Sequence, residues 1–83
     1  MKENNNKRAL EPGQEFVVSF IFQEEDGRIQ MGTDTYGLYE SLKENPEMSD
    51  GEITMRLQNV IYGVYHDCYH KNGNVVILNW WLF

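Results

Sequence analysis

One short segment constrains the fold more than any other part of the chain. Between residues 15 and 23, apolar side chains recur at every second position, and aromatic and β-branched types dominate. A period of two with these residue types is typical of a β-strand, because successive side chains of a strand point to opposite faces. One face of the expected strand carries Phe16, Val18, Phe20 and Phe22, and the other carries Val17, Ser19, Ile21 and Gln23.

The strand is followed by a turn signal at residues 25–28, where Asp26-Gly27 stands at the centre. An Asp-Gly pair tolerates the positive φ angles of a two-residue hairpin loop. Residues 15–33 therefore predict a β-hairpin, and a two-residue loop places Ile29, Met31 and Phe22 on one face of it. The expected register pairs Phe22 with Met31 and Phe20 with Thr33.

Residues 34–45 follow the hairpin in the chain and predict a short helix. Asp34 or Thr35 can cap its start, and Pro46 ends it because the residue before a proline avoids the helical region. The apolar residues Leu38, Tyr39 and Leu42 would lie on one side of this helix.

Residues 49–72 allow two interpretations. Ser49 and Glu52 form a capping-box pattern, and Asn72-Gly73 supplies a left-handed stop, as expected for a helix. A strand is the alternative, because residues 53–58 also alternate and Asn-Gly is also a hairpin turn. We favour the helix, since an apolar stripe at steps of three and four persists for four turns. The stripe comprises Ile53, Leu57, Val60, Ile61, Val64, Tyr65 and Cys68.

Residues 74–83 predict a final strand, with the continuous apolar run of a strand covered on both faces. We expect it to lie between the other strands or against another molecule. Val17 and Ile21 likewise indicate partial cover on the second face of the first strand. The predicted fold class is α+β, a small single domain over residues 15–83. It has the order β-β-α-α-β, with two helices on one face of an antiparallel three-stranded sheet, and residues 1–14 form a flexible N-terminal tail.

Length and charge limit the classes of function. A chain of 83 residues supports one domain with a thin core, and a single cysteine, Cys68, indicates a reducing compartment. Signal-peptide and membrane-spanning patterns are missing from the sequence, so we expect a cytoplasmic protein. The net charge is −6, and residues 11–52 carry eleven acids against two bases, a balance of −9. This charge disfavours direct nucleic-acid binding, because phosphate contacts need Lys and Arg.

The densest cluster of reactive side chains is His66, Cys68 and His70. Two histidines four residues apart on a helix can share a metal ion, and a strand would bring all three to one face. The alternative is structural, because histidines also stabilise the negative end of a helix and Cys68 lies on the apolar stripe. A structural zinc site normally takes four ligands from separated pairs, and no second pair is evident. We therefore expect no metal cofactor. Phosphate-binding glycine loops, paired-cysteine motifs and serine-centred elbows are also missing from the sequence, so we expect no catalytic residue and no enzymatic activity.

Acidic and aromatic residues are the remaining candidates for binding. Glu24, Glu25 and Asp26 cluster at the hairpin tip, and Glu40 and Glu44 share one face of the first expected helix. Tyrosine and tryptophan are enriched in protein interfaces, although a small domain also uses them in its core. The predicted partner-binding residues are Tyr36, Tyr39, Glu40, Glu44, Glu24, Glu25 and Asp26. The predicted self-association residues are Trp80, Trp81 and Phe83, so a homo-oligomer is also expected as an alternative.

The segment from Phe16 to Arg28, which ends in Gln23-Glu24-Glu25-Asp26-Gly27-Arg28, resembles the first hairpin of a small phage inhibitor of uracil-DNA glycosylase. Leu38-Tyr39-Glu40 is similar to the aromatic-glutamate contact helix of that inhibitor. The likeness covers about twenty-five residues and implies an acidic inhibitor that imitates DNA. The leading hypothesis is thus a small acidic, non-catalytic interaction module, an inhibitor or regulator of phage or mobile-element type that binds a host protein. The alternatives are a metal or small-ligand domain centred on His66, Cys68 and His70, and a structural subunit that assembles through its C-terminal strand.

Overall fold

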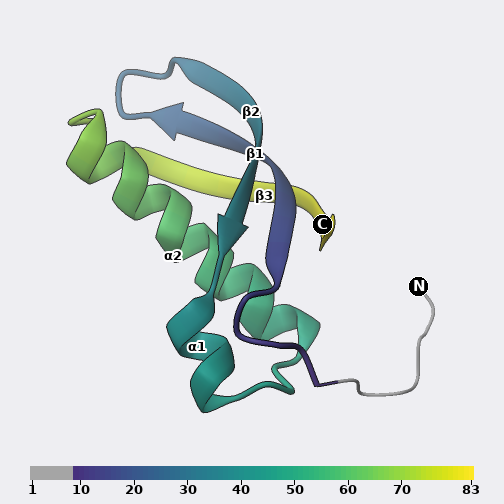
Figure 1. Ribbon diagram of the computed structural model, residues 1–83. Helices are drawn as coiled ribbons and strands as arrows, with labels where there is room; N and C mark the ends of the chain where they lie inside the picture. The colour runs from purple at the N-terminus through teal and green to yellow at the C-terminus, as the bar shows by residue number, and fades with distance from the viewer. Residues whose placement is uncertain (1–8) are drawn as a thin grey trace.

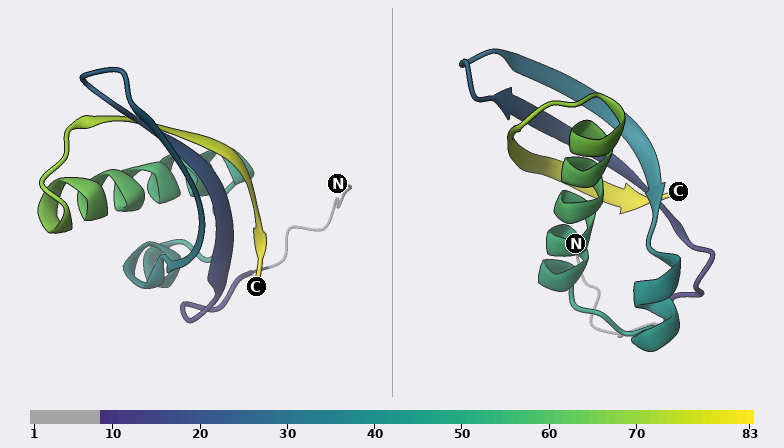
Figure 2. Two further views of the ribbon diagram at one scale, coloured as in Figure 1. Left: turned by 90° about the horizontal axis from the view of Figure 1, so that it is seen from above. Right: turned by 90° about the vertical axis from the view of Figure 1, so that its left-hand side faces the viewer.

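The computed structural model describes residues 9–83, which form an antiparallel three-stranded sheet and two helices (Figure 1). The sheet order is β2-β1-β3, so the first strand is central. Both helices lie on the same side of the sheet, which confirms the predicted α+β class and the order β-β-α-α-β (Figure 2). The elements are β1 (Glu15–Glu24), β2 (Ile29–Gly37), α1 (Tyr39–Glu44), α2 (Asp50–Cys68) and β3 (Gly73–Leu82).

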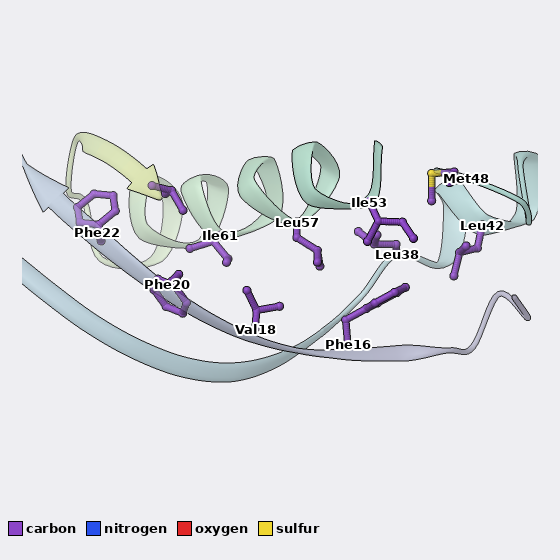
Figure 3. Packing of buried hydrophobic residues seen from close by; sticks show 11 residues of the cluster. Phe16, Val18, Phe20, Phe22, Leu38, Leu42, Met48, Ile53, Leu57 and Ile61 are labelled. Atoms are coloured by element: carbon purple, nitrogen blue, oxygen red, sulfur yellow. The ribbon is translucent and has the colours of Figure 1, made fainter. Parts of the chain in front are cut away.

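The core lies between the central strand and α2 (Figure 3). The even-numbered residues of β1 point toward the helices and are buried, as their alternation predicts. Burial of each such side chain contributes about 1.5–3 kcal/mol. The facing stripe of α2 supplies Ile53, Leu57 and Ile61, and the segment around α1 supplies Leu38, Leu42 and Met48.

The hairpin is present, but the predicted register is wrong by one residue. Glu24 and Arg28 close a three-residue loop, in which the Gly27 N–H donates to the Glu24 carbonyl at 2.9 Å. Gly27 has a φ of 95°, the left-handed conformation that follows a type I turn in such loops. Phe22 therefore pairs with Gln30, and Ile21 pairs with Met31. Because side chains alternate, this one-residue shift moves Ile29 and Met31 to the face opposite Phe22.

The first helix is shorter than predicted, because strand β2 continues through Asp34 and Thr35 to Gly37. These two residues are therefore strand residues, and the prediction that one of them caps the helix is wrong. Cross-strand pairing with β1 determines their conformation, and threonine suits a strand. The residue at the N-cap position is Leu38, which makes no side-chain cap bond, and the helix ends before Pro46, as predicted.

Helix α2 confirms the favoured interpretation of the ambiguous segment. The Ser49 hydroxyl accepts a hydrogen bond from the Glu52 N–H at 3.2 Å, and the Glu52 carboxylate accepts one from the Ser49 N–H at 3.3 Å. This is the predicted capping box. The predicted stop at Asn72-Gly73 is wrong, because the residue with a left-handed φ of 57° after the helix is His70.

Strand β3 forms an edge of the sheet, beside β1, so the prediction that it lies between the other strands is wrong. It is also covered on one face rather than on both, because Val76 and Leu78 are half exposed. Leu78 is the extra residue at an irregularity in the pairing with β1, where Ser19 faces Asn79 and Phe20 faces Ile77. After this bulge Trp80 faces the helices.

Residues 9–14 lead into β1 along the end of the domain that carries α1. Leu10 packs against the core, and its N–H donates to the Pro46 carbonyl at 2.8 Å. The flexible tail expected over residues 1–14 falls mostly on residues 1–8, which lie outside the described residues. Among residues 9–83, neither helix has the length and apolar character needed to cross a membrane.

Candidate interaction surface

The sheet has an outer face that no described helix or strand covers. Figure 2 shows both helices on one side of the curved sheet and no described element packed on the other. Pairing and alternation determine which side chains point outward. We call this surface the outer sheet face. Its apolar members are Val17, Ile21, Ile29, Met31, Val76, Leu78 and Trp81.

Five of the seven apolar side chains of the outer sheet face are exposed, and Val17 and Ile21 are partly buried. Met31 is 73% exposed and Ile29 is 59% exposed, although both lie within a paired strand. Val76, Leu78 and Trp81 are between two-fifths and three-fifths exposed on β3. Single exposed apolar residues are common on soluble proteins, whereas contiguous apolar sets are more typical of contact surfaces.

The polar members of the outer sheet face carry no charge. They are Ser19, Gln23, Thr33, Thr35, Asn74 and Asn79. Near the middle of the face, the Ser19 and Thr33 hydroxyls bond to each other at 3.1 Å across the β1–β2 pair. Among the residues of the three strands that point outward, the charged one is Glu15, at the rim where β1 begins.

The predicted acidic cluster at the hairpin tip is largely paired within the chain. The Glu24 carboxylate is 10% exposed and accepts hydrogen bonds from Lys71 Nζ at 3.0 Å and Gln30 Nε2 at 2.8 Å. The Lys71 hydrogen bond is the main cause that lowers the pKa of Glu24, with Gln30 second. Arg28 donates to Asp26 through its backbone N–H and its Nε, and these bonds lower the pKa of Asp26. Glu25 remains exposed at the tip.

The structure separates the two tyrosines that were predicted to act together. Tyr39, Glu40 and Glu44 are exposed on α1, as a contact surface requires. Tyr36 instead belongs to β2, where it faces the helices and packs edge-on against Phe20 with ring centroids 6.4 Å apart. Burial is the main cause that raises the pKa of Tyr36 to about 12, and the nearby Asp34 carboxylate adds to the effect.

Exposed acids gather at the end of the molecule that carries α1. Glu47, Asp50 and Glu52 follow the helix in the chain and are exposed beside Glu40 and Glu44. Within residues 38–52 the one basic residue is Lys43, so this segment has a balance of −4 (five acids against one base). Among the described residues, the ion pairs lie elsewhere, around Glu24, Asp26 and Asp67. We call residues 38–52 the acidic end.

A shallow hollow of about 170 Å³ lies between β2 and α2. Its lining includes Asp34, Tyr36, Tyr65 and Tyr69. Tyr65 and Tyr69 meet edge-on with ring centroids 5.2 Å apart, and burial is the main cause that raises the pKa of Tyr65. Tyrosine rings beside a carboxylate attract a cation, so the hollow is chemically suited to the end of a Lys or Arg side chain.

The three predicted metal ligands do not converge. His66 lies on α2, where its Nδ1 is 3.0 Å from the Asp67 carboxylate and its ring stacks on Tyr62 with centroids 5.8 Å apart. Cys68 is an exposed free thiol at the end of the helix, and His70 follows in the left-handed conformation. Within residues 9–83, no three His, Cys, Asp or Glu side chains are placed to hold one ion.

The residues predicted for self-association point in different directions. Trp80 faces the helices, where its indole N–H donates to the Thr54 hydroxyl at 2.8 Å and its ring meets Phe16 edge-on. Trp81 belongs to the outer sheet face, and Phe83 is exposed beyond the end of β3.

Sequence reasoning missed six of the seven apolar members of the outer sheet face as binding candidates: Val17, Ile21, Ile29, Met31, Val76 and Leu78. A three-residue loop, which also accepts Gly27, would have placed Ile29 and Met31 beside Ile21. Ile29 and Met31 were therefore missed because the sequence analysis assumed a two-residue loop, although Gly27 suits a loop of either two or three residues.

Comparison with known proteins assigns no relative. The chain matches no protein-family model, no curated protein and no solved structure. The surfaces of the molecule are therefore the basis on which a function can be proposed.

Proposed function

We propose that this protein is a non-catalytic interaction module that works by placing the outer sheet face against another protein surface. The observation that carries the proposal is the exposure of Met31, Ile29 and Leu78 on a face without charged residues at its centre. Apolar side chains are unfavourably exposed to water. Their burial against another protein stabilises the complex by about 25 cal/mol per Å² of apolar surface. A catalytic pocket is not needed for this role.

The acidic end supports a second part of the proposal, a basic partner. Tyr39 supplies an exposed aromatic ring beside Glu40 and Glu44, and aromatic residues are enriched in protein interfaces. A negative surface speeds association with a positive one and excludes acidic competitors. The module would act as an inhibitor or regulator of phage or mobile-element type, by occupying a basic site on a host protein. Metal binding has less support, because His66, Cys68 and His70 do not converge.

Affinity capture from a bacterial lysate tests both parts. Wild-type protein is compared with Met31→Lys, which changes the outer sheet face, and with the double variant Glu40→Lys/Glu44→Lys, which changes the acidic end. We expect the double variant, or salt of about 0.5 M, to release a basic partner, because salt screens exposed charges. We expect Met31→Lys to abolish contacts made through the outer sheet face.

The matched control is Asn59→Lys, which adds the same charge on the exposed side of α2, away from the outer sheet face. A set of bound proteins that is the same for all four chains would count against both surfaces. Loss of a partner in one variant alone would assign that partner to one surface.

A further inference from the structure

We propose that the outer sheet face packs against the same face of a second copy of this chain, so that two three-stranded sheets form a sandwich. This inference rests on the proposed function and names the partner of that surface. Two like faces related by a twofold axis make an isologous interface, the commonest arrangement in soluble oligomers. Twisted sheets pack face to face with their strands about 30° apart and the sheets about 10 Å apart.

Charge is the first reason to expect a second copy. Each chain carries a net charge of −6, so two copies repel each other wherever their acidic surfaces meet. The outer sheet face is the place where this repulsion is weakest, because Glu15 at the rim is the charged residue among the outward-pointing strand positions. A strongly basic partner would instead find no counter-charge at the centre of this face and would favour the acidic end.

The Ser19–Thr33 pair is the second reason, because its burial costs little, whereas the Asn79 amide beside Ser19 must find its hydrogen-bond partner across the interface. Ser19 and Thr33 lie near the centre and already bond to each other at 3.1 Å. A buried polar group is costly when it loses its hydrogen-bond partner, and these two hydroxyls keep theirs when water leaves. Gln23 and Asn74 pair at one end of the sheet, where water can still reach them.

The size of the face is the third reason. About eight residues of each strand, at about 3.3 Å per residue and with strands about 4.8 Å apart, give a footprint of about 26 by 14 Å. Side chains stand out from this footprint, so two faces together bury about 1,000 Å² of accessible surface, the lower limit for a specific interface. Interfaces at this lower limit are weak, so we expect a dimer that forms only as the protein concentration rises.

The pairing of the strands aligns three apolar side chains that we expect to make the central contacts of the dimer. Met31 pairs with Ile21 in the neighbouring strand, and Ile21 pairs with Val76 on its other side. This row of apolar side chains crosses all three strands. A flexible methionine adapts its shape to the surface it meets, which suits a contact between two copies of the same row.

Sedimentation equilibrium of the purified full chain, from low micromolar to near-millimolar concentration, tests the proposal. We expect the wild type to change from monomer to dimer over this range. Met31→Lys and Leu78→Lys each place a charge on the face, and each should weaken dimerisation at least about tenfold, since a buried unpaired charge is costly. Both residues are more than half exposed, so both variants should keep the wild-type circular dichroism spectrum.

Met55→Lys is the matched control, because it makes the same substitution at a methionine of α2 that is more than half exposed and lies on the other side of the sheet. It should dimerise as the wild type does. Added salt should strengthen the dimer, because salt screens repulsion between the two acidic chains. A dimer that weakens with salt would contradict an uncharged interface.

Three further results would overturn the proposal. The first is a wild-type chain that stays monomeric at every concentration. The second is a dimer that Met31→Lys leaves unchanged, since Met31 lies on β2 and pairing through the free edge of β3 would not involve it. The third is a monomer that captures a different protein through Met31; the second copy would then be wrong, while the proposed interaction module would stand.

Discussion

A single glycine sets how closely β2 approaches the core. A Cβ added to Gly32 would lie 2.8 Å from Cζ of the Phe20 ring, which is closer than real Cβ atoms approach. The ring cannot move freely, because it is buried and contacts Tyr36 and Tyr65 edge-on. We predict that Gly32→Ala lowers the free energy of unfolding by about 1–3 kcal/mol through overpacking, as measured by urea denaturation.

Gly37→Ala is the control for that substitution. It is also in β2, but a Cβ there would meet open space. Alanine restricts the unfolded chain, so this variant should be neutral or more stable by up to about 1 kcal/mol. Equal destabilisation by both substitutions would show that strand glycines matter for a reason other than the Phe20 ring.

The Glu24–Lys71 pair makes stability depend on pH in the acid range. The hydrogen bond from Lys71 is the main cause that lowers the pKa of Glu24 below its usual 4.5. Its stabilising effect is complete above pH 4.5 and is lost as the pH falls through the lower pKa of the folded state. We predict that Glu24→Gln reduces the loss of stability between neutral and acid pH.

Urea denaturation at pH 7 and at acid pH measures this difference. Glu25→Gln serves as the control, because Glu25 is exposed at the same turn and makes no side-chain hydrogen bond within residues 9–83. If Glu24→Gln leaves the loss of stability at acid pH unchanged, other carboxylates must cause that loss.

Helix α2 depends on the cap at its N-terminus. The reciprocal hydrogen bonds of Ser49 and Glu52 satisfy two backbone N–H groups that the helix itself leaves without a partner. We predict that Ser49→Ala costs about 1 kcal/mol of stability. Thermal unfolding followed by circular dichroism measures the effect. Asn59→Ala, in the middle of the same helix on its exposed side, should cost nothing, and a similar loss in both variants would argue against the cap.

Elements with several agreeing local signals were predictable from the sequence. For α2, the cap and the four-turn apolar stripe indicated the same helix, and the structure confirms it over Asp50–Cys68. For β1, the alternation alone identified the strand and its buried face. Local hydrogen bonding and side-chain periodicity act within a few residues, so a sequence contains most of this information.

Features that depend on pairing between distant segments were not predictable in the same way. Gly27 suits loops of two or three residues, and only the contacts of the whole strand decide between them. That choice determines whether Met31 is buried or exposed. Similarly, Asp34 and Thr35 are plausible helix caps, but pairing with β1 makes them strand residues. The outer sheet face was missed because it depends on the register.

At the scale of the whole molecule, the helices protect one side of a thin sheet. Helix α2 lies against β3, where the Gln58 side chain donates to the Val75 carbonyl at 2.6 Å, and it leaves the other side of the sheet without described cover. A chain of this size buries about 60–65% of the surface it exposes when unfolded. Covering the outer sheet face would therefore add substantially to a small core.

Association and stability are coupled in such a molecule. A partner that binds only the folded chain raises its stability by mass action, so a self-associating domain becomes more stable as its concentration increases. This dependence is absent from a monomer. The acidic end lies outside the proposed interface, so the dimer would present two copies of it to a basic partner.

The most direct test of the outer sheet face is therefore the midpoint of thermal unfolding, measured by calorimetry across a wide range of protein concentration. We predict that the Tm of the wild type rises steadily with concentration, whereas the Tm of Met31→Lys stays constant and equals that of the dilute wild type. A wild-type Tm that does not change with concentration would contradict the proposed dimer, because it would mean that no second copy covers the outer sheet face.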